Sequence, residues 1–60
     1  MNKVKKYRLR KNLTQKQLAE KSGVDIQIIQ RLEQGANTTS AEKANDLAMA
    51  LGVDKNGLFD

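Results

Sequence analysis

The stretch of residues 15–34, QKQLAEKSGVDIQIIQRLEQ, constrains the fold more than any other part of the chain, because two short amphipathic segments meet in it at a glycine. Thr14 and Gln17 form a T-x-x-Q capping box, which predicts that a helix begins there. Gly23 adopts the left-handed backbone conformation without a side-chain penalty, so we expect it to end this helix. Asp25 then predicts the N-cap of a second helix.

The second predicted helix has two chemically different sides. At about 100° per residue, its aliphatic side chains fall on one side and its polar side chains on the other. An ordinary solvent-facing helix side is built from Lys and Glu, whereas Gln and Arg can pair bidentately with adenine and guanine in the DNA major groove. This polar side is therefore typical of a base-reading surface. The aliphatic residues are Ile28, Ile29 and Leu32, and the polar residues are Gln27, Gln30, Arg31 and Gln34.

In these residues the chain resembles the helix-turn-helix of the phage repressor and Cro (XRE-type) DNA-binding family. A lone helix-turn-helix pattern has many false matches, but here the likeness covers nearly the whole chain. The resemblance implies an all-α fold, a compact five-helix bundle of the lambda-repressor-like DNA-binding type. The matching positions are Leu18, Ala19, Gly23, Val24, Ile29, Leu32, Glu33 and Gly35, with Val4, Leu13, Gln15, Leu47, Ala48, Leu51, Gly52, Val53, Leu58 and Phe59.

Composition restricts the possible functions. Sixty residues predict one domain, 1–60, and a chain of this size buries only about 60% of its unfolded surface on folding. The chain has no His and no Cys, and its serines have no neighbouring base, so we expect no enzyme, no metal site, no cofactor and no small-molecule substrate.

The net charge is +4, and every charged residue within 1–12 is basic. This excess predicts an anionic partner, either nucleic acid or a membrane surface.

Two observations argue against a membrane partner and against secretion. Val4, Tyr7 and Leu9 do not line up into the continuous apolar face that an interfacial helix requires. The basic N-terminal segment is not followed by an apolar region that could act as a signal peptide, and no apolar run approaches the length of a membrane span. We therefore expect a cytoplasmic protein.

A first helix is predicted over residues 3–11, with Val4 and Tyr7 turned inward. Leu9 does not fit this inward face. Asn12 stands where the family usually has glycine, and asparagine is the next most tolerant residue of a left-handed helix end.

A fourth helix is predicted after a short polar connection that follows Gly35. Either Thr39 with Glu42 or Ser40 alone would cap it, and Asp54 would cap a last short turn. We expect an apolar stripe along the fourth helix, with Leu47 beside it. The stripe consists of Ala41, Ala44, Ala48 and Leu51.

Four residues are predicted to contact the DNA backbone. Gln15 and Lys16 lie in the first turn of a helix, where free N–H groups and the helix dipole favour phosphate, and the resembling family uses this glutamine in that way. Asn37 and Thr38 replace basic residues that the family often has in this loop, but they can still donate hydrogen bonds to phosphate.

One structural ion pair is implied by the resemblance. The family has an arginine at the position of Arg8 that pairs with a glutamate at the position of Glu33. The alternative is a solvated arginine.

Base reading is predicted for Gln27, Gln30 and Arg31, which lie on the outward side of the first two turns of the second helix of the motif. Ile26 is unusual, because relatives mostly have a polar or basic residue there. Two interpretations stay open for it: an ordinary exposed aliphatic side chain, or a contact to the methyl group of thymine.

Together these features predict a sequence-specific double-stranded DNA-binding transcriptional regulator, most simply a repressor. We expect it to bind a near-palindromic operator as a homodimer, with residues 25–34 in the major groove. The alternative is a protein-interaction adaptor, antitoxin-like or a regulatory partner, with the same fold. An adaptor should have an aromatic or aliphatic anchor cluster on the outward side, and Ile26 is the only residue that supports it. RNA binding is less favoured, because exposed aromatic residues for base stacking are lacking.

Overall fold

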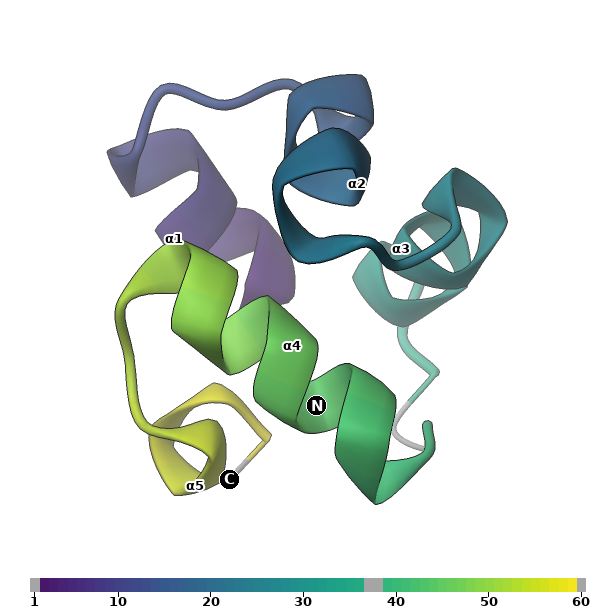
Figure 1. Ribbon diagram of the computed structural model, residues 1–60, viewed down its shortest axis with the longest axis vertical. Coiled ribbons are helices and arrows are strands. Elements are labelled where there is room, and N and C mark those ends of the chain that lie inside the picture. The colour runs from purple at the N-terminus through teal and green to yellow at the C-terminus, as the bar shows by residue number, and fades with distance from the viewer. Residues whose placement is uncertain (1, 37–38, 60) are drawn as a thin grey trace.

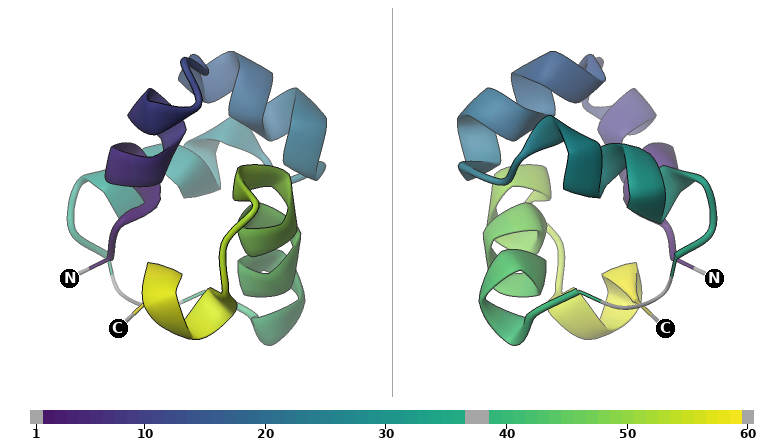
Figure 2. Two further views of the ribbon diagram at one scale, coloured as in Figure 1. Left: turned by 90° about the vertical axis from the view of Figure 1, so that its left-hand side faces the viewer. Right: turned by 90° about the vertical axis from the view of Figure 1, so that its right-hand side faces the viewer.

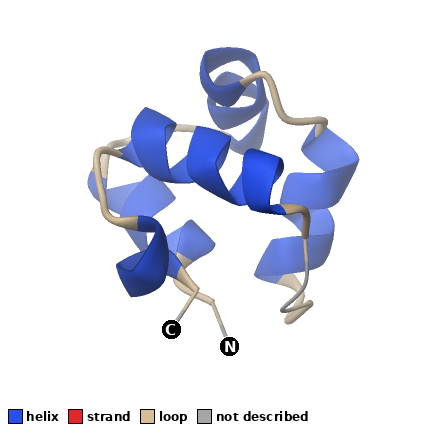
Figure 3. Cartoon of the chain, turned by 60° about the horizontal axis from the view of Figure 1, so that its bottom comes forward, coloured by secondary structure: helices blue, strands red, loops and turns tan. Residues whose placement is uncertain are grey.

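Five helices follow one another along the chain in the computed structural model, which describes residues 2–36 and 39–59 (Figure 1). The described residues contain no strand, and loops join the helices (Figure 3). The prediction of an all-α, five-helix fold is confirmed. The helices are α1 (Val4–Arg10), α2 (Gln15–Ser22), α3 (Ile26–Glu33), α4 (Ala41–Leu51) and α5 (Lys55–Leu58).

Polar side chains cap the starts of four helices. The hydroxyl of Thr14 accepts a hydrogen bond from the backbone N–H of Gln17, and the Gln17 side chain accepts one from the N–H of Thr14, which completes the predicted capping box. Asp25 and Asp54 cap α3 and α5 through their carboxylates. For α4 the cap is Ser40, so the alternative with Thr39 is wrong.

The ends of α1 and α2 need a left-handed residue, and the sequence supplies one at each. Asn12 has a φ of 57°, and its N–H donates to the carbonyl of Leu9. Gly23 has a φ of 76°, and its N–H donates to the carbonyl of Ala19. Asn12 therefore has the left-handed conformation that the sequence predicts for it.

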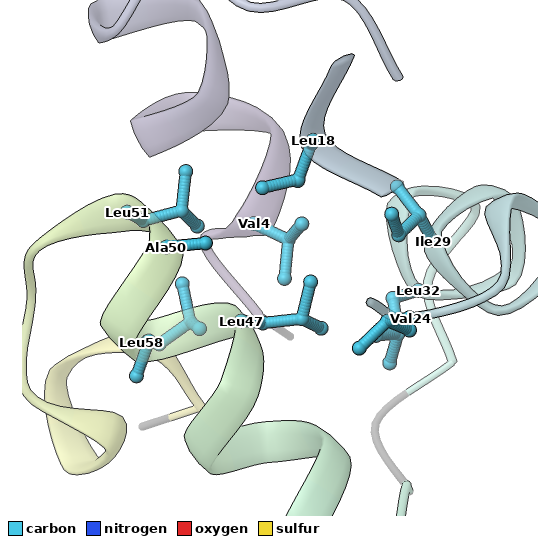
Figure 4. Close-up of a cluster of buried hydrophobic side chains, with 10 residues drawn as sticks. Val4, Leu18, Val24, Ile29, Leu32, Leu47, Ala50, Leu51 and Leu58 are labelled. Carbon is cyan, nitrogen blue, oxygen red and sulfur yellow. The ribbon is translucent and has the colours of Figure 1, made fainter. Parts of the chain in front are cut away.

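The hydrophobic core lies where all five helices meet (Figure 4). Each fully buried Leu or Ile contributes about 1.5–3 kcal/mol relative to exposure, so these contacts hold the helices in place. Two of the core residues, Ile29 and Leu32, come from α3 and fix its inner side to the bundle. The core comprises Val4, Leu18, Val24, Ile29, Leu32, Leu47, Ala48, Ala50, Leu51 and Leu58.

The predicted apolar stripe of α4 is wrong at one position. Ala41 is exposed, whereas Ala50, which was not expected in the stripe, is buried. Helix α4 contacts α1, α2 and α5, so more than one of its sides is covered, and Leu47, Ala48, Ala50 and Leu51 are buried in its C-terminal half. Ala41 is the first residue of α4, at the end opposite to these buried residues.

The two ends of the described chain lie side by side (Figure 2). The backbone N–H of Lys3 donates to the carbonyl of Leu58 at 2.8 Å. The side-chain amide of Asn2 donates to the carbonyls of Leu32 (2.7 Å) and Ala36 (2.8 Å), and its oxygen accepts from the N–H of Val4 (3.1 Å). Asn2 thus joins the start of α1 to the end of α3.

Replacing Asn2 with alanine should reduce the free energy of unfolding by about 1–2 kcal/mol, because carbonyls at the end of α3 lose a donor. Chemical denaturation followed by circular dichroism measures this change. The matched control is Asn45→Ala, which alters an exposed asparagine on α4. Equal stability of the two variants would contradict the role given to Asn2.

Candidate nucleic-acid interface

Helix α3 separates its apolar and polar side chains as the sequence predicts. Ile29 and Leu32 have relative exposures of 0% and 2%, and Ile28 is partly buried against the core. The four polar side chains on the other side are all exposed, and α3 lies at the edge of the bundle (Figure 1). They are Gln27, Gln30, Arg31 and Gln34.

The turn between α2 and α3 is held by more than its glycine. The hydroxyl of Ser22 donates to the carbonyl of Leu18 at 2.7 Å and accepts from the N–H of Val24 at 3.1 Å. Val24 itself is buried in the core, with a relative exposure of 3%. Sequence reasoning did not identify Ser22, although a serine just before the Gly23 helix end is a common local signal for such side-chain to backbone bonding.

An ion pair joins α1 to the end of α3. Arg8 donates from Nε to Glu33 Oε2 at 2.7 Å and from Nη2 to Glu33 Oε1 at 3.0 Å, which is the bidentate geometry that arginine forms with carboxylates. Its third donor, Nη1, bonds to the carbonyl of Leu13 at 2.8 Å. The hydrogen bond to Glu33 raises the pKa of Arg8 above its ordinary value, so this side chain stays charged at every physiological pH. The structure therefore contains the pair that the resemblance implies.

Gln15 extends this network to α2. Its side-chain nitrogen donates to Glu33 Oε1 at 3.1 Å, so the glutamate carboxylate holds side chains from two other helices. One N–H of the Gln15 amide and its carbonyl oxygen are not used by this bond. Gln15 is partly buried and Lys16 beside it is exposed, so the start of α2 offers an oriented amide and an exposed ammonium group. The bond between Gln15 and Glu33 was not anticipated from the sequence.

A hollow of about 320 Å³ lies between α3 and the start of α4. Arg31 and Lys43 line it together with the hydroxyl-bearing Thr39 and Ser40. The sequence did not indicate Lys43 as a neighbour of Arg31, because a single lysine in a helix is most often solvated. Asn37 and Thr38, predicted to contact the DNA backbone, lie outside the described residues.

Ile26 is less exposed than the sequence suggests. It is the first residue of α3 and is partly buried, where it borders a second hollow of about 650 Å³ at the side of α2. The other lining residues are Lys16, Ala19, Glu20, Gly23, Val24 and Asp25.

Residues 2–36 and 39–59 lack two further features. Within these residues, no group of three or more His, Cys, Asp or Glu side chains is placed to hold a metal ion. No helix of this described part is both long and apolar enough to span a membrane.

Comparison with known proteins places these features in a family. A helix-turn-helix family model matches residues 4–58. The chain belongs to the XRE-type helix-turn-helix family. An uncharacterized HTH-type transcriptional regulator of Methanocaldococcus jannaschii is 41% identical over 58 residues, which are 97% of this chain and 88% of the relative. No solved structure matches the chain.

The helix-turn-helix should depend on the Arg8–Glu33 pair for its stability. Arg8→Ala leaves the Glu33 carboxylate largely buried without its guanidinium partner, since only 6% of that side chain is exposed. We expect a loss of about 3–5 kcal/mol in the free energy of unfolding, measured by chemical denaturation. Gln15→Ala removes one hydrogen bond to the same carboxylate and should cost about 1 kcal/mol.

The control for this experiment is Arg10→Ala, an exposed arginine on the same helix. If Arg8→Ala is no less stable than Arg10→Ala, the pair does not hold α1 to α3.

Proposed function

We propose that this chain is a sequence-specific double-stranded DNA-binding transcriptional regulator that places α3 in the major groove. The observation that carries this proposal is the outward side of α3, where Gln27, Gln30 and Arg31 are all exposed while the opposite side is fixed in the core. Glutamine can bond bidentately to adenine, and arginine to guanine. Membership of a family whose relative is named a transcriptional regulator supports the same conclusion.

The rigid mounting of α3 favours recognition of sequence. Binding costs less conformational entropy when the reading side chains start from a fixed helix, because only the side chains and not the backbone must be ordered. Three separate contacts fix α3: its buried Ile29 and Leu32, the Arg8–Glu33 pair, and the hydrogen bond from Asn2 to Leu32. The backbone of α3 can therefore present its outward side chains in one register.

Contacts to phosphate would position the helix. Gln15 and Lys16 at the start of α2 offer donors on one side of α3, and Lys43 of α4 offers positive charge on the other. Asn37 and Thr38 remain candidates for the same role.

Recognition by one copy of α3 covers too little DNA to be selective. The helix has eight residues, so at about 1.5 Å per residue it is about 12 Å long and reaches roughly four base pairs. We therefore propose a homodimer on DNA whose two α3 helices are about 34 Å apart and read the half-sites of a near-palindromic operator. Occupation of such an operator would block transcription, which makes a repressor the simplest regulator of this kind.

The adaptor alternative finds less support. It calls for an aliphatic or aromatic anchor cluster on the outward side of α3, where Gln27, Gln30 and Arg31 are exposed instead. The large apolar residues found exposed, Leu9 and Met49, lie on α1 and α4.

Selection of bound duplexes from a random DNA pool tests this proposal. The chain should enrich a two-fold motif, and Gln27→Ala and Arg31→Ala should each relax the preference at particular positions, by about 1–3 kcal/mol per lost contact. The control is Gln34→Ala, which alters an exposed glutamine at the far end of α3 and should leave the motif unchanged.

If the unaltered chain enriches no motif in repeated selections, sequence-specific binding is contradicted. A motif that all three variants read equally well would contradict the placement of α3 in the groove.

A further inference from the structure

Ile26 occupies an unusual position for an aliphatic side chain. It is partly buried, yet the partly buried apolar residues that pack against the core include Ala19 and Ile28 but not Ile26. It borders instead a shallow, open hollow that Ala19 also lines, whereas Val24 at the same hollow is only 3% exposed and belongs to the core. The core therefore does not explain an isoleucine at this position.

The helical spacing places Ile26 among the proposed base-reading residues. Residues four apart on a helix are neighbours on its surface, so Ile26 lies next to Gln30, as Gln27 lies next to Arg31. The outward side of α3 thus has two adjacent rows of side chains. One row is Ile26 with Gln30, and the other is Gln27 with Arg31. As the first residue of α3, Ile26 also lies at the end of the helix that contacts base edges in helix-turn-helix docking.

Two acidic residues, Glu20 and Asp25, border this hollow against one basic residue, Lys16, which we have proposed as a contact to phosphate. The carboxylate of Asp25, which also borders the hollow, repels phosphate. The same carboxylate accepts the N–H of Gln27 at 2.8 Å, so this backbone donor at the start of α3 is already used. An apolar surface beside an acidic cap suits a base edge rather than the DNA backbone.

The major groove offers one apolar group at the base edges of ordinary DNA, the C5 methyl group of thymine. An A·T pair presents this methyl group on the same edge as the adenine N6 and N7 that a glutamine recognises. A row formed by an isoleucine and a glutamine therefore matches the chemistry of A·T pairs.

We propose that Ile26, with Ala19 beside the same hollow, forms a subsite for a pyrimidine C5 methyl group. The subsite takes thymine and, because the same methyl group stands at the same ring position, 5-methylcytosine. It does not take unmodified cytosine or uracil. This inference rests on the proposed DNA binding of α3 and adds to it a sensitivity to base methylation.

A methyl scan of the selected duplex tests the subsite. Each thymine is replaced in turn by uracil, which removes only the methyl group, and Kd is measured for every duplex. At one position in each half-site, the unaltered chain should bind the uracil duplex about fourfold more weakly, the factor that corresponds to burial of a single methyl group. Cytosine at that position should bind more weakly than thymine, and 5-methylcytosine should recover part of the difference.

Two variants assign the effect to Ile26. Ile26→Ala should bind the thymine duplex more weakly and should no longer distinguish thymine from uracil. Ile26→Val keeps a branched aliphatic side chain and should retain the distinction. Because Ile26 lies outside the core, both variants should fold, and circular dichroism checks this.

The outcomes separate the two proposals. The methyl subsite is overturned if no uracil replacement weakens binding of the selected duplex. It is also overturned if the uracil effect is equally large in Ile26→Ala. Both outcomes leave DNA binding intact. Unchanged DNA affinity of Ile26→Ala also overturns the methyl subsite. Absence of any duplex binding overturns the proposed function and the subsite together.

Discussion

The rest of the structure depends on the carboxylate of Glu33. It accepts two hydrogen bonds from Arg8 of α1 and one from Gln15 of α2, so one side chain at the end of α3 fixes three helices relative to one another. The guanidinium that neutralises it is also tied to the carbonyl of Leu13, in the loop between α1 and α2. A buried carboxylate is unfavourable without such partners, and this requirement gives the arrangement its specificity.

This network and the core constrain α3 in complementary ways. Apolar contacts of Ile29 and Leu32 hold its inner side but are non-directional, whereas hydrogen bonds from Arg8 and Asn2 fix its position along the helix axis. The chain has no disulfide, because it contains no Cys, so these contacts are the means by which the short α3 keeps one orientation. The outward side can then be polar without loss of stability.

The sequence predicted the elements whose signals are local. Caps at Thr14 and Asp25 and the two-sided pattern of α3 follow from residues at most a few positions apart. Bonds between distant residues could not be predicted in this way: Asn2 and Leu32 are 30 positions apart, and Gln15 and Glu33 are 18 apart. The resemblance supplied the Arg8–Glu33 pair, which spacing alone would not have indicated.

Helix α4 shows the limit of periodicity. A stripe read from the sequence assumes one covered side, but α4 contacts α1, α2 and α5, so Ala50 is buried while Ala41, the first residue of α4, is exposed. Ile26 is likewise partly buried and not fully exposed, and residues of α2 border the same hollow as Ile26. Both differences arise from tertiary neighbours and not from helix geometry.

The central claim is that the outward side of α3 contacts base edges, and two-dimensional NMR of the glutamine side-chain amides tests it most directly. On addition of a selected duplex to the isotope-labelled chain, the account predicts that the amide signals of Gln27 and Gln30 shift strongly while that of Gln34 changes little. Unchanged Gln27 and Gln30 signals, with shifts confined to residues around Met49 on α4, would contradict it.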